Sequence, residues 1–197
     1  MLRVNVGLLS GRTEVLEVER ASNVRDLKVL AQNSFQRAFL KLVTAGGRPL
    51  VDLDESLEAA GIQDKDLVTA VPLQAQLAAN DRAFALWCHG GDHVVTWGDP
   101  EYGADSSAVQ DQLKDVQQVQ ATHAAFAAIL ADGSVVTWGN PRFGGNSCEV
   151  QDWLKSVQQV QATKTAFAAV LTDGSVVTWG DSDCGGDSSE VQDQLKG

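Results

Sequence analysis

The octapeptide DGSVVTWG occurs twice in this chain, at residues 132–139 and again at residues 173–180. A degraded third version covers residues 92–98, so that Trp97, Trp138 and Trp179 follow one another at intervals of 41 residues. A period of this length is typical of stacked supersecondary units, each of which buries its apolar face against a neighbour. The octapeptide therefore predicts a repeat array that begins at about residue 82.

The two complete copies carry clear signals of β-structure. Aligning residues 98–138 with residues 139–179 gives 28 identities in 41 positions, so both copies are expected to have the same conformation. Residues 125–130 alternate as a strand, Asp132-Gly133 is a hairpin signal, and residues 135–138 form the partner strand. The spacing of Val150, Leu154 and Val157 after Ser147 predicts a short amphipathic helix between one copy and the next.

Aromatic residues recur at fixed places in these copies and are expected to pack neighbouring units together. The predicted packing residues are Trp97, Trp138, Trp179, Phe126 and Phe167. Trp153 differs from them, because it replaces Gln112 and Gln194 of the other copies on the predicted helix. It is therefore either a candidate protein-binding residue or a local packing variant.

The order Val-x-x-Val-x-Ala, Phe-Ala-x-x-Leu, DGSVVTWG and a Gly-Gly loop, found over residues 116–139 and 157–180, resembles the repeats of the regulator of chromosome condensation family. That resemblance implies a mainly-β array of three propeller-blade-like units of 41 residues. Four blades of this length would need more chain than follows residue 81, and propellers need about four to eight blades to close. Either subunits complete one another, or the chain is a fragment of a longer protein, or the units pack as an open or trefoil-like array.

The first 73 residues read as a separate domain. Leu2, Val4 and Val6 alternate like a strand, a second strand follows Gly11, and a helix is predicted from about residue 23 to residue 34. Further strands are expected at residues 39–44 and 67–71. This order, with the turn AGGRPL at residues 45–50 and Gly61-Ile62 after Ser56-Leu57, resembles the ubiquitin-like family. The resemblance implies an α+β, β-grasp domain over residues 1–73, joined by a linker at residues 74–81 to the repeats at residues 82–197.

The ubiquitin-like resemblance also bears on binding. The last strand continues into Pro72-Leu73-Gln74 and has no diglycine tail, so a built-in domain is expected and not a conjugated modifier. By position, Leu9, Val43 and Ala70 fall where ubiquitin carries its apolar recognition patch, which makes them candidate protein-binding residues. The alternative is a reused fold in which these residues have no binding role.

Charge and cysteine content narrow the classes of partner and location. The net charge is −11, and residues 74–197 carry six Lys or Arg against 16 Asp or Glu, so a nucleic-acid partner is not expected. The three cysteines do not recur between copies, which argues against a disulfide framework. No signal peptide and no apolar run of about 20 residues is visible, so direct membrane insertion is not expected. The expected location is the cytoplasm or nucleus, or an organelle if a transit peptide was removed.

No set of residues points to catalysis or to a cofactor. Cys88, His89 and His93 are the one cluster of metal-capable side chains, but a zinc site would need a fourth ligand and the other copies have none. The acidic loops could suggest calcium, yet the middle copy has Arg142 at an acidic position. His123, which aligns with Lys164, is expected to face solvent. We therefore predict no catalytic residue, no metal, no cofactor and no enzyme.

The sequence favours a non-enzymatic protein-protein interaction or scaffold protein. Its expected partners are other proteins, or further copies of itself that cover open sheet edges. Two alternatives stay open: an accessory structural subunit of a larger multiprotein assembly, and an adaptor in ubiquitin and proteasome signalling.

Overall fold

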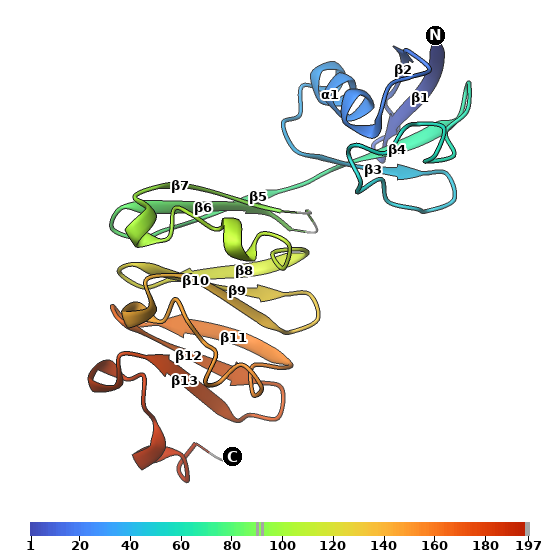
Figure 1. Cartoon of the computed structure of the whole chain (residues 1–197). Helices are drawn as coiled ribbons and strands as arrows, with labels where there is room; N and C mark the ends of the chain where they lie inside the picture. The colour runs from blue at the N-terminus through green and yellow to red at the C-terminus, as the bar shows by residue number, and fades with distance from the viewer. Residues whose placement is uncertain (90, 92, 196–197) are drawn as a thin grey trace. The chain divides into compact units, whose positions relative to one another are not determined.

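The computed structural model describes residues 1–89, 91 and 93–195, which form two compact units, Met1–Gln74 and Ala75–Gly197 (Figure 1). Three predicted features reach residues outside this part: the loop that contains Gly90, the third version of the octapeptide, which begins at Asp92, and the end of the array at residues 196–197. The described residues contain thirteen strands and one α-helix. No described helix is long and apolar enough to cross a membrane.

The first unit is a four-stranded sheet with a single α-helix. Its elements are β1 (Leu2–Leu8), β2 (Thr13–Val18), α1 (Val24–Phe35), β3 (Leu40–Thr44) and β4 (Leu67–Pro72). The strand order is β2-β1-β4-β3, in which the central pair β1 and β4 is parallel and the outer pairs are antiparallel. Apolar residues of α1 and of the strands form one continuous buried core in this unit.

Local sequence explains where α1 begins and ends. The Asn23 side chain accepts a hydrogen bond from the Asp26 N–H, and the Asp26 carboxylate accepts one from the Asn23 N–H, which completes a capping box. Gln36 closes the helix in the left-handed conformation, with φ 53°. Between these caps, Leu27 and Ala31 lie one turn apart on the buried face.

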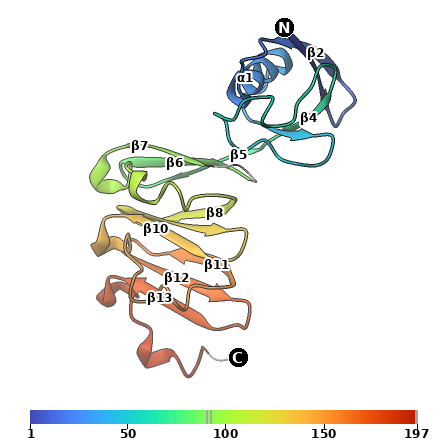
Figure 2. The same ribbon diagram turned by 45° about the vertical axis from the view of Figure 1, so that its right-hand side comes forward.

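The second unit contains three antiparallel sheets of three strands each, in the orders β5-β6-β7, β8-β9-β10 and β11-β12-β13. Figures 1 and 2 show the three sheets lying one upon the next along the chain. Their strands are β5 (Ala75–Ala79), β6 (Ala83–Cys88), β7 (Val94–Gly98), β8 (Val116–Ala121), β9 (Ala125–Leu130), β10 (Val135–Gly139), β11 (Val157–Ala162), β12 (Ala166–Leu171) and β13 (Val176–Gly180). The prediction of a β-rich repeat array is confirmed.

The central strand β9 shows how the sheets pack. Phe126 and Ala128 on one of its faces belong to the core shared with the first sheet, whereas Ala127 and Ile129 on the other face belong to the core shared with the third. Each face of β9 combines small alanines with one larger side chain, Phe126 on one face and Ile129 on the other, because each face must fit closely against a neighbouring sheet. The middle sheet is consequently buried on both faces.

The predicted hairpins close with a repeated side-chain contact. The Ser134 N–H and hydroxyl both donate to the Asp132 carboxylate, at 2.9 and 2.6 Å, and Gly133 takes a left-handed φ of 80°. Both hydrogen bonds lower the pKa of Asp132 below its usual value, and the bond from the Ser134 hydroxyl has the larger effect. Asp173 and Ser175 repeat the arrangement in the third sheet.

Two predicted elements differ from the structure. Residues 75–79, assigned to a linker, form β5, because their backbone pairs with β6 and completes the first sheet. The amphipathic helix expected at Val150, Leu154 and Val157 is absent from this described stretch: Val157 begins β11, and the residues before it form turns. The short 3₁₀ helices of the unit are Pro100–Tyr102, Ser107–Val109, Pro141–Phe143, Ser182–Cys184 and Ser189–Val191.

Candidate interaction site

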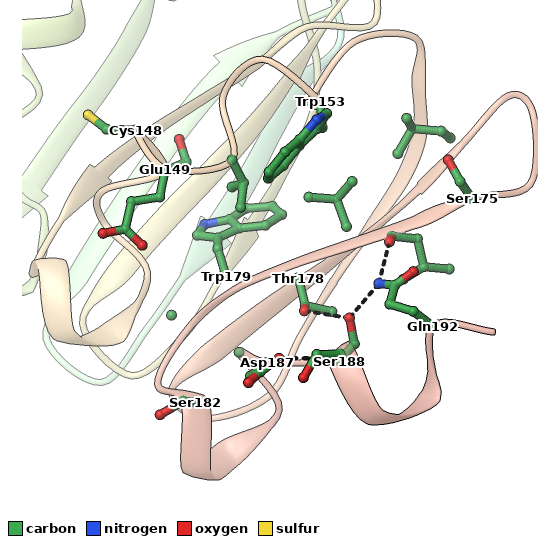
Figure 3. Close-up of a pocket in the computed structure, with 18 of the residues that line it drawn as sticks. Cys148, Glu149, Trp153, Ser175, Thr178, Trp179, Ser182, Asp187, Ser188 and Gln192 are labelled. Atoms are coloured by element: carbon green, nitrogen blue, oxygen red, sulfur yellow. Dashed lines mark hydrogen bonds between the residues drawn. The ribbon is translucent and has the colours of Figure 1, made fainter. Parts of the chain in front are cut away.

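An open groove of about 1030 Å³ runs along β13 of the third sheet (Figure 3). One wall comes from residues 146–153, which connect the second sheet to the third, and the other comes from residues 182–192, which follow β13. We call it the Trp153 groove. A smaller hollow of about 650 Å³ lies at the corresponding place one repeat earlier, between residues 105–109 and residues 137–141. Both repeats thus form a hollow at the same place, and the hollow beside β13 is the larger of the two.

A Thr-Ser-Gln contact set fixes the wall of the groove to the sheet. The Thr178 and Ser188 hydroxyls lie 2.9 Å apart, and Gln192 Nε2 donates to the Ser188 hydroxyl at 2.8 Å and to the Val176 carbonyl oxygen at 3.1 Å, as Figure 3 shows in part. Equivalent residues make the same threonine-serine and glutamine-carbonyl contacts in the other two repeats: Thr96, Ser106 and Gln110, and Thr137, Ser147 and Gln151. These polar residues have a structural role, since they pin each connecting segment to the last strand of its sheet.

The described lining of the groove carries negative charge. Glu149, Asp173 and Asp187 are among the lining residues, and neither Lys nor Arg is. Hydrogen bonds from Ser175 lower the pKa of Asp173, the bond from its hydroxyl more than the bond from its N–H. Hydrogen bonds from Ser189 lower the pKa of Asp187, and here the bond from the N–H has the larger effect. Both carboxylates are therefore ionised at neutral pH.

Trp153 supplies a large exposed ring to the groove. Its side chain is 61% exposed, and Figure 3 shows it close to Trp179 on one side of the hollow. Trp179 is held in place, because its ring stacks on Phe167 at 5.2 Å and its Nε1 donates to the Gly144 carbonyl oxygen at 3.0 Å. Of these two rings, Trp153 is therefore the exposed one and Trp179 the buried one.

The groove does not hold an evident catalytic arrangement. Its described lining has hydroxyl, carboxylate and thiol groups but no imidazole, and the Thr178 and Ser188 hydroxyls contact each other. Across the described chain, no group of three or more His, Cys, Asp or Glu residues could hold a metal ion.

The predicted packing residues occupy two kinds of position. Phe126, Trp138, Phe167 and Trp179 are at most 5% exposed, and each phenylalanine stacks on the tryptophan of the neighbouring strand at 5.2 Å. Trp97 stacks in the same way on Phe84 but is 44% exposed. The prediction that Trp97 packs one repeat on another is wrong, because among the described residues of the second unit no other sheet lies against its face of the first sheet.

The three predicted contact residues of the first unit do not share one surface. Leu9 is 78% exposed after β1, and Val43 is half-buried on β3. Ala70 is fully buried in the core beneath β4, so its assignment as a contact residue is wrong. Alternation along β4 explains the error, since Thr69 is the residue of β4 paired with Val43.

A series of side-chain ring contacts, with an arginine at one end, was not predicted. The Arg82 guanidinium lies 5.0 Å from the Tyr102 ring, and the His123 ring lies 5.2 Å from both Tyr102 and Phe143. His123 is therefore half-buried between aromatic rings, and not fully solvated as expected. The sequence showed that Tyr102 and Phe143 occupy equivalent positions in consecutive repeats. Their contacts with His123 could not be predicted, because they depend on how the sheets stack.

Comparison with known proteins adds little to this geometry. No family model matches the chain, and no curated protein matches it. Among solved structures, the chain is similar to part of one described as the crystal structure of ATBAG1 in complex with HSP70, with 16% identity and a TM-score of 0.34. The similarity covers 36% of this chain and 40% of that chain. A likeness this weak carries no argument about family or function.

Proposed function

We propose that this chain is a non-enzymatic scaffold protein whose Trp153 groove binds a basic segment of a partner protein. One observation carries the proposal: an exposed tryptophan, found in one repeat only, stands in a groove that contains three carboxylates and no basic residue among its described lining. Tryptophan and arginine are enriched among residues that dominate binding energy, and a cation over an indole ring gains about 0.5–2 kcal/mol. A Lys or Arg side chain would find both its ring and its counter-ion here.

A protein partner fits this groove better than a nucleic acid. Nucleic-acid binding depends on Lys and Arg that neutralise phosphates, whereas Glu149, Asp173 and Asp187 would repel them. An extended basic peptide also fits the groove, because it is open and bordered by β13, the last strand of its sheet.

We further propose that the first unit is a built-in ubiquitin-like domain and that the second is an array of blades like those of the regulator of chromosome condensation family. The strand order β2-β1-β4-β3, with a parallel central pair and one helix against the sheet, supports the first assignment. Three successive antiparallel sheets with DGSVVTWG-type final strands support the second. Both assignments agree with a scaffold role, in which one chain joins two binding modules.

The binding proposal is tested with fluorescein-labelled peptides of about 12 residues that vary in Lys and Arg content, read by fluorescence anisotropy. The variant Trp153→Gln installs the residue that stands at positions 112 and 194, so it should fold normally. We expect it to weaken binding of the best basic peptide about tenfold, or about 1.4 kcal/mol. Glu149→Gln should weaken binding in the same direction.

Glu190→Gln provides the matched control. It removes the same charge from an exposed residue that does not line the groove, so any loss common to both variants reports general acidity. If no basic peptide binds, or if Trp153→Gln binds as well as the original chain, the proposal fails.

A further inference from the structure

Contacts between consecutive sheets always join the same two kinds of face. The face of the second sheet that meets the first carries Phe126, Val136 and Trp138, together with Val119 of β8. The third sheet presents the equivalent residues Phe167, Val177, Trp179 and Val160 to the second. The second unit, which we call the repeat unit, thus contains two instances of one interface. The sequence identity between the copies explains why the two interfaces are alike.

The first sheet carries the same face, and among the described residues of the second unit nothing covers it. We call this the head face and define it by Leu77, Phe84, Val95 and Trp97, which are 56%, 39%, 47% and 44% exposed. Their equivalents in the second sheet, Val119, Phe126, Val136 and Trp138, are 6%, 0%, 7% and 4% exposed. Four large apolar side chains on one small sheet form a patch of the kind that marks an interaction surface.

The opposite face of the third sheet is open in the same sense. We call it the tail face and define it by Ala168 and Val170 of β12 with Val191 and Leu195 of the segment after β13. Ala168, Val170 and Leu195 are half-buried, and Val191 is 43% exposed. In the second repeat the equivalents Ala127, Ile129 and Leu154 are at most 5% exposed, because the third sheet covers them.

The glycine that follows the last strand of each sheet independently indicates that the tail face lacks the phenylalanine of a next sheet. A Cβ at Gly103 would lie 2.9 Å from the Phe126 ring, and one at Gly144 would lie 2.6 Å from the Phe167 ring, so each loop is a seat for the next phenylalanine. Each glycine carbonyl oxygen also accepts a hydrogen bond from the Nε1 of the next tryptophan: Gly103 from Trp138 and Gly144 from Trp179, both at 3.0 Å. Gly185 has the same left-handed φ, 98°, yet nothing lies within 4 Å of its Cβ position.

We propose that the head face of one copy docks on the tail face of a second copy and reproduces the internal sheet interface. In this arrangement Phe84 lies over Gly185 of the second copy, and Trp97 Nε1 donates to the Gly185 carbonyl oxygen. A second copy is the occupant that the structure favours, because both complementary surfaces belong to this chain and their mode of contact is present twice within it. Such a contact is heterologous, so further copies add in the same direction until a ring closes. The inference does not depend on the Trp153 groove, and Trp153→Gln should leave self-association unchanged.

The first test is a complementation experiment on the full chain, read by light scattering after gel filtration. We expect the original chain to exceed its monomer mass of 21.0 kDa as its concentration rises. Val95→Lys spoils the head face and Val191→Lys the tail face, and each variant alone should remain a monomer at concentrations at least tenfold higher. Mixing the two should restore a 1:1 dimer that grows no further, because one good head then meets one good tail. Val15→Lys, a charge added at an exposed valine of the first unit, should associate like the original chain.

A cross-linking experiment tests the same contact without altering either apolar face. Position 81 is equivalent to His123, which contacts Tyr102, and Cys184 is equivalent to Tyr102. In a background of Cys148→Ser, Asp81→Cys should therefore be joined to the native Cys184 of another copy by a short bis-maleimide, whereas Glu19→Cys should not. A chain that remains monomeric up to about 100 µM, variants that fail to complement, or cross-linking equal to the Glu19→Cys control would each overturn the proposal. These outcomes would point to another domain or a foreign protein as the cover of the head face.

Discussion

Single glycines decide how closely one repeat approaches the next. Gly144 takes a left-handed φ of 86° and leaves room for the Phe167 ring directly above it, and its carbonyl oxygen accepts the bond from Trp179. A side chain there would have to adopt a strained backbone and also push the ring out of the interface. Backbone conformation and packing between sheets therefore depend on the same residue.

Replacing this residue separates the two effects. Gly144→Ala should lower the free energy of unfolding of the repeat unit by about 2–5 kcal/mol, because backbone strain and overpacking add. Gly185→Ala is the matched control, with a similar φ and open space, and should cost about 1–2 kcal/mol. Urea unfolding at submicromolar concentration, followed by tryptophan fluorescence, measures both, since all five tryptophans lie in the repeat unit. Equal losses for the two variants would show that the ring contact contributes nothing.

At the level of elements, equivalent strands differ in how much stability they provide. The strand β9 is covered on both faces, β6 on one face by the second sheet, and β12 on one face by the second sheet. The same Phe-Ala pattern thus serves a doubly buried strand in the middle and singly buried strands at the two ends. Terminal repeats are accordingly expected to be the less stable parts of the stack.

The two equivalent phenylalanines of β6 and β9 test this difference. Phe126→Ala should cost about 3–5 kcal/mol of unfolding free energy, because a fully buried ring leaves a cavity between two sheets. Phe84→Ala should cost about 1 kcal/mol or less in the monomer, because that ring is 39% exposed and stacks on Trp97, which is itself 44% exposed. The same fluorescence-detected unfolding applies, and a Phe84→Ala loss as large as that of Phe126→Ala would contradict the assignment of the head face as open.

Sequence reasoning located the elements whose signals are local. Asp132-Gly133 indicated a hairpin, and the structure has one, because the turn residues themselves fix its geometry. The helix expected at Val150 and Leu154 is wrong, since the Thr-Ser-Gln contacts hold this segment as turns against β10. Which face of a strand is covered also escaped prediction: burial of Trp138 and exposure of Trp97 follow from their sheets' places in the stack, although their local sequences are alike.

The sequence singled out one residue of the groove, Trp153, but did not predict the groove itself. Trp153 stood out because its aligned residues are glutamines, and the structure places it 61% exposed at the groove. The carboxylates around it come from both sides of β13, so only folding brings Glu149 and Asp187 to the same hollow. Alignment of the copies identified the unusual side chain, whereas its charged surroundings required the structure.

On the scale of the whole molecule, the chain consists of two units with separate cores. The core of the first unit draws all its buried residues from positions 2–70, and the cores of the second draw theirs from position 83 onward. No buried apolar cluster among the described residues combines the two. Each unit therefore has its own basis for stability.

A fragment of residues 1–74 should consequently fold alone. We expect a cooperative thermal transition by circular dichroism and a dispersed amide NMR spectrum, with contacts between the parallel strands β1 and β4 at Val6 and Val68. The variant Leu27→Ala, which opens a cavity in this core, should lower the midpoint of that transition and serves as the positive control. A fragment without such a transition would show that its fold requires the repeats.

The fixed relation between successive sheets has a consequence for how such a chain changes length over generations. A duplicated 41-residue segment inserted after Gly139 would meet, on both sides, surfaces that already fit its own, because every sheet in the stack offers the same two faces. Deleting one copy would rejoin compatible faces just as well. Unequal recombination between such similar copies can therefore add or remove a whole sheet without creating a new interface, while point changes such as Trp153 give individual copies their own surface.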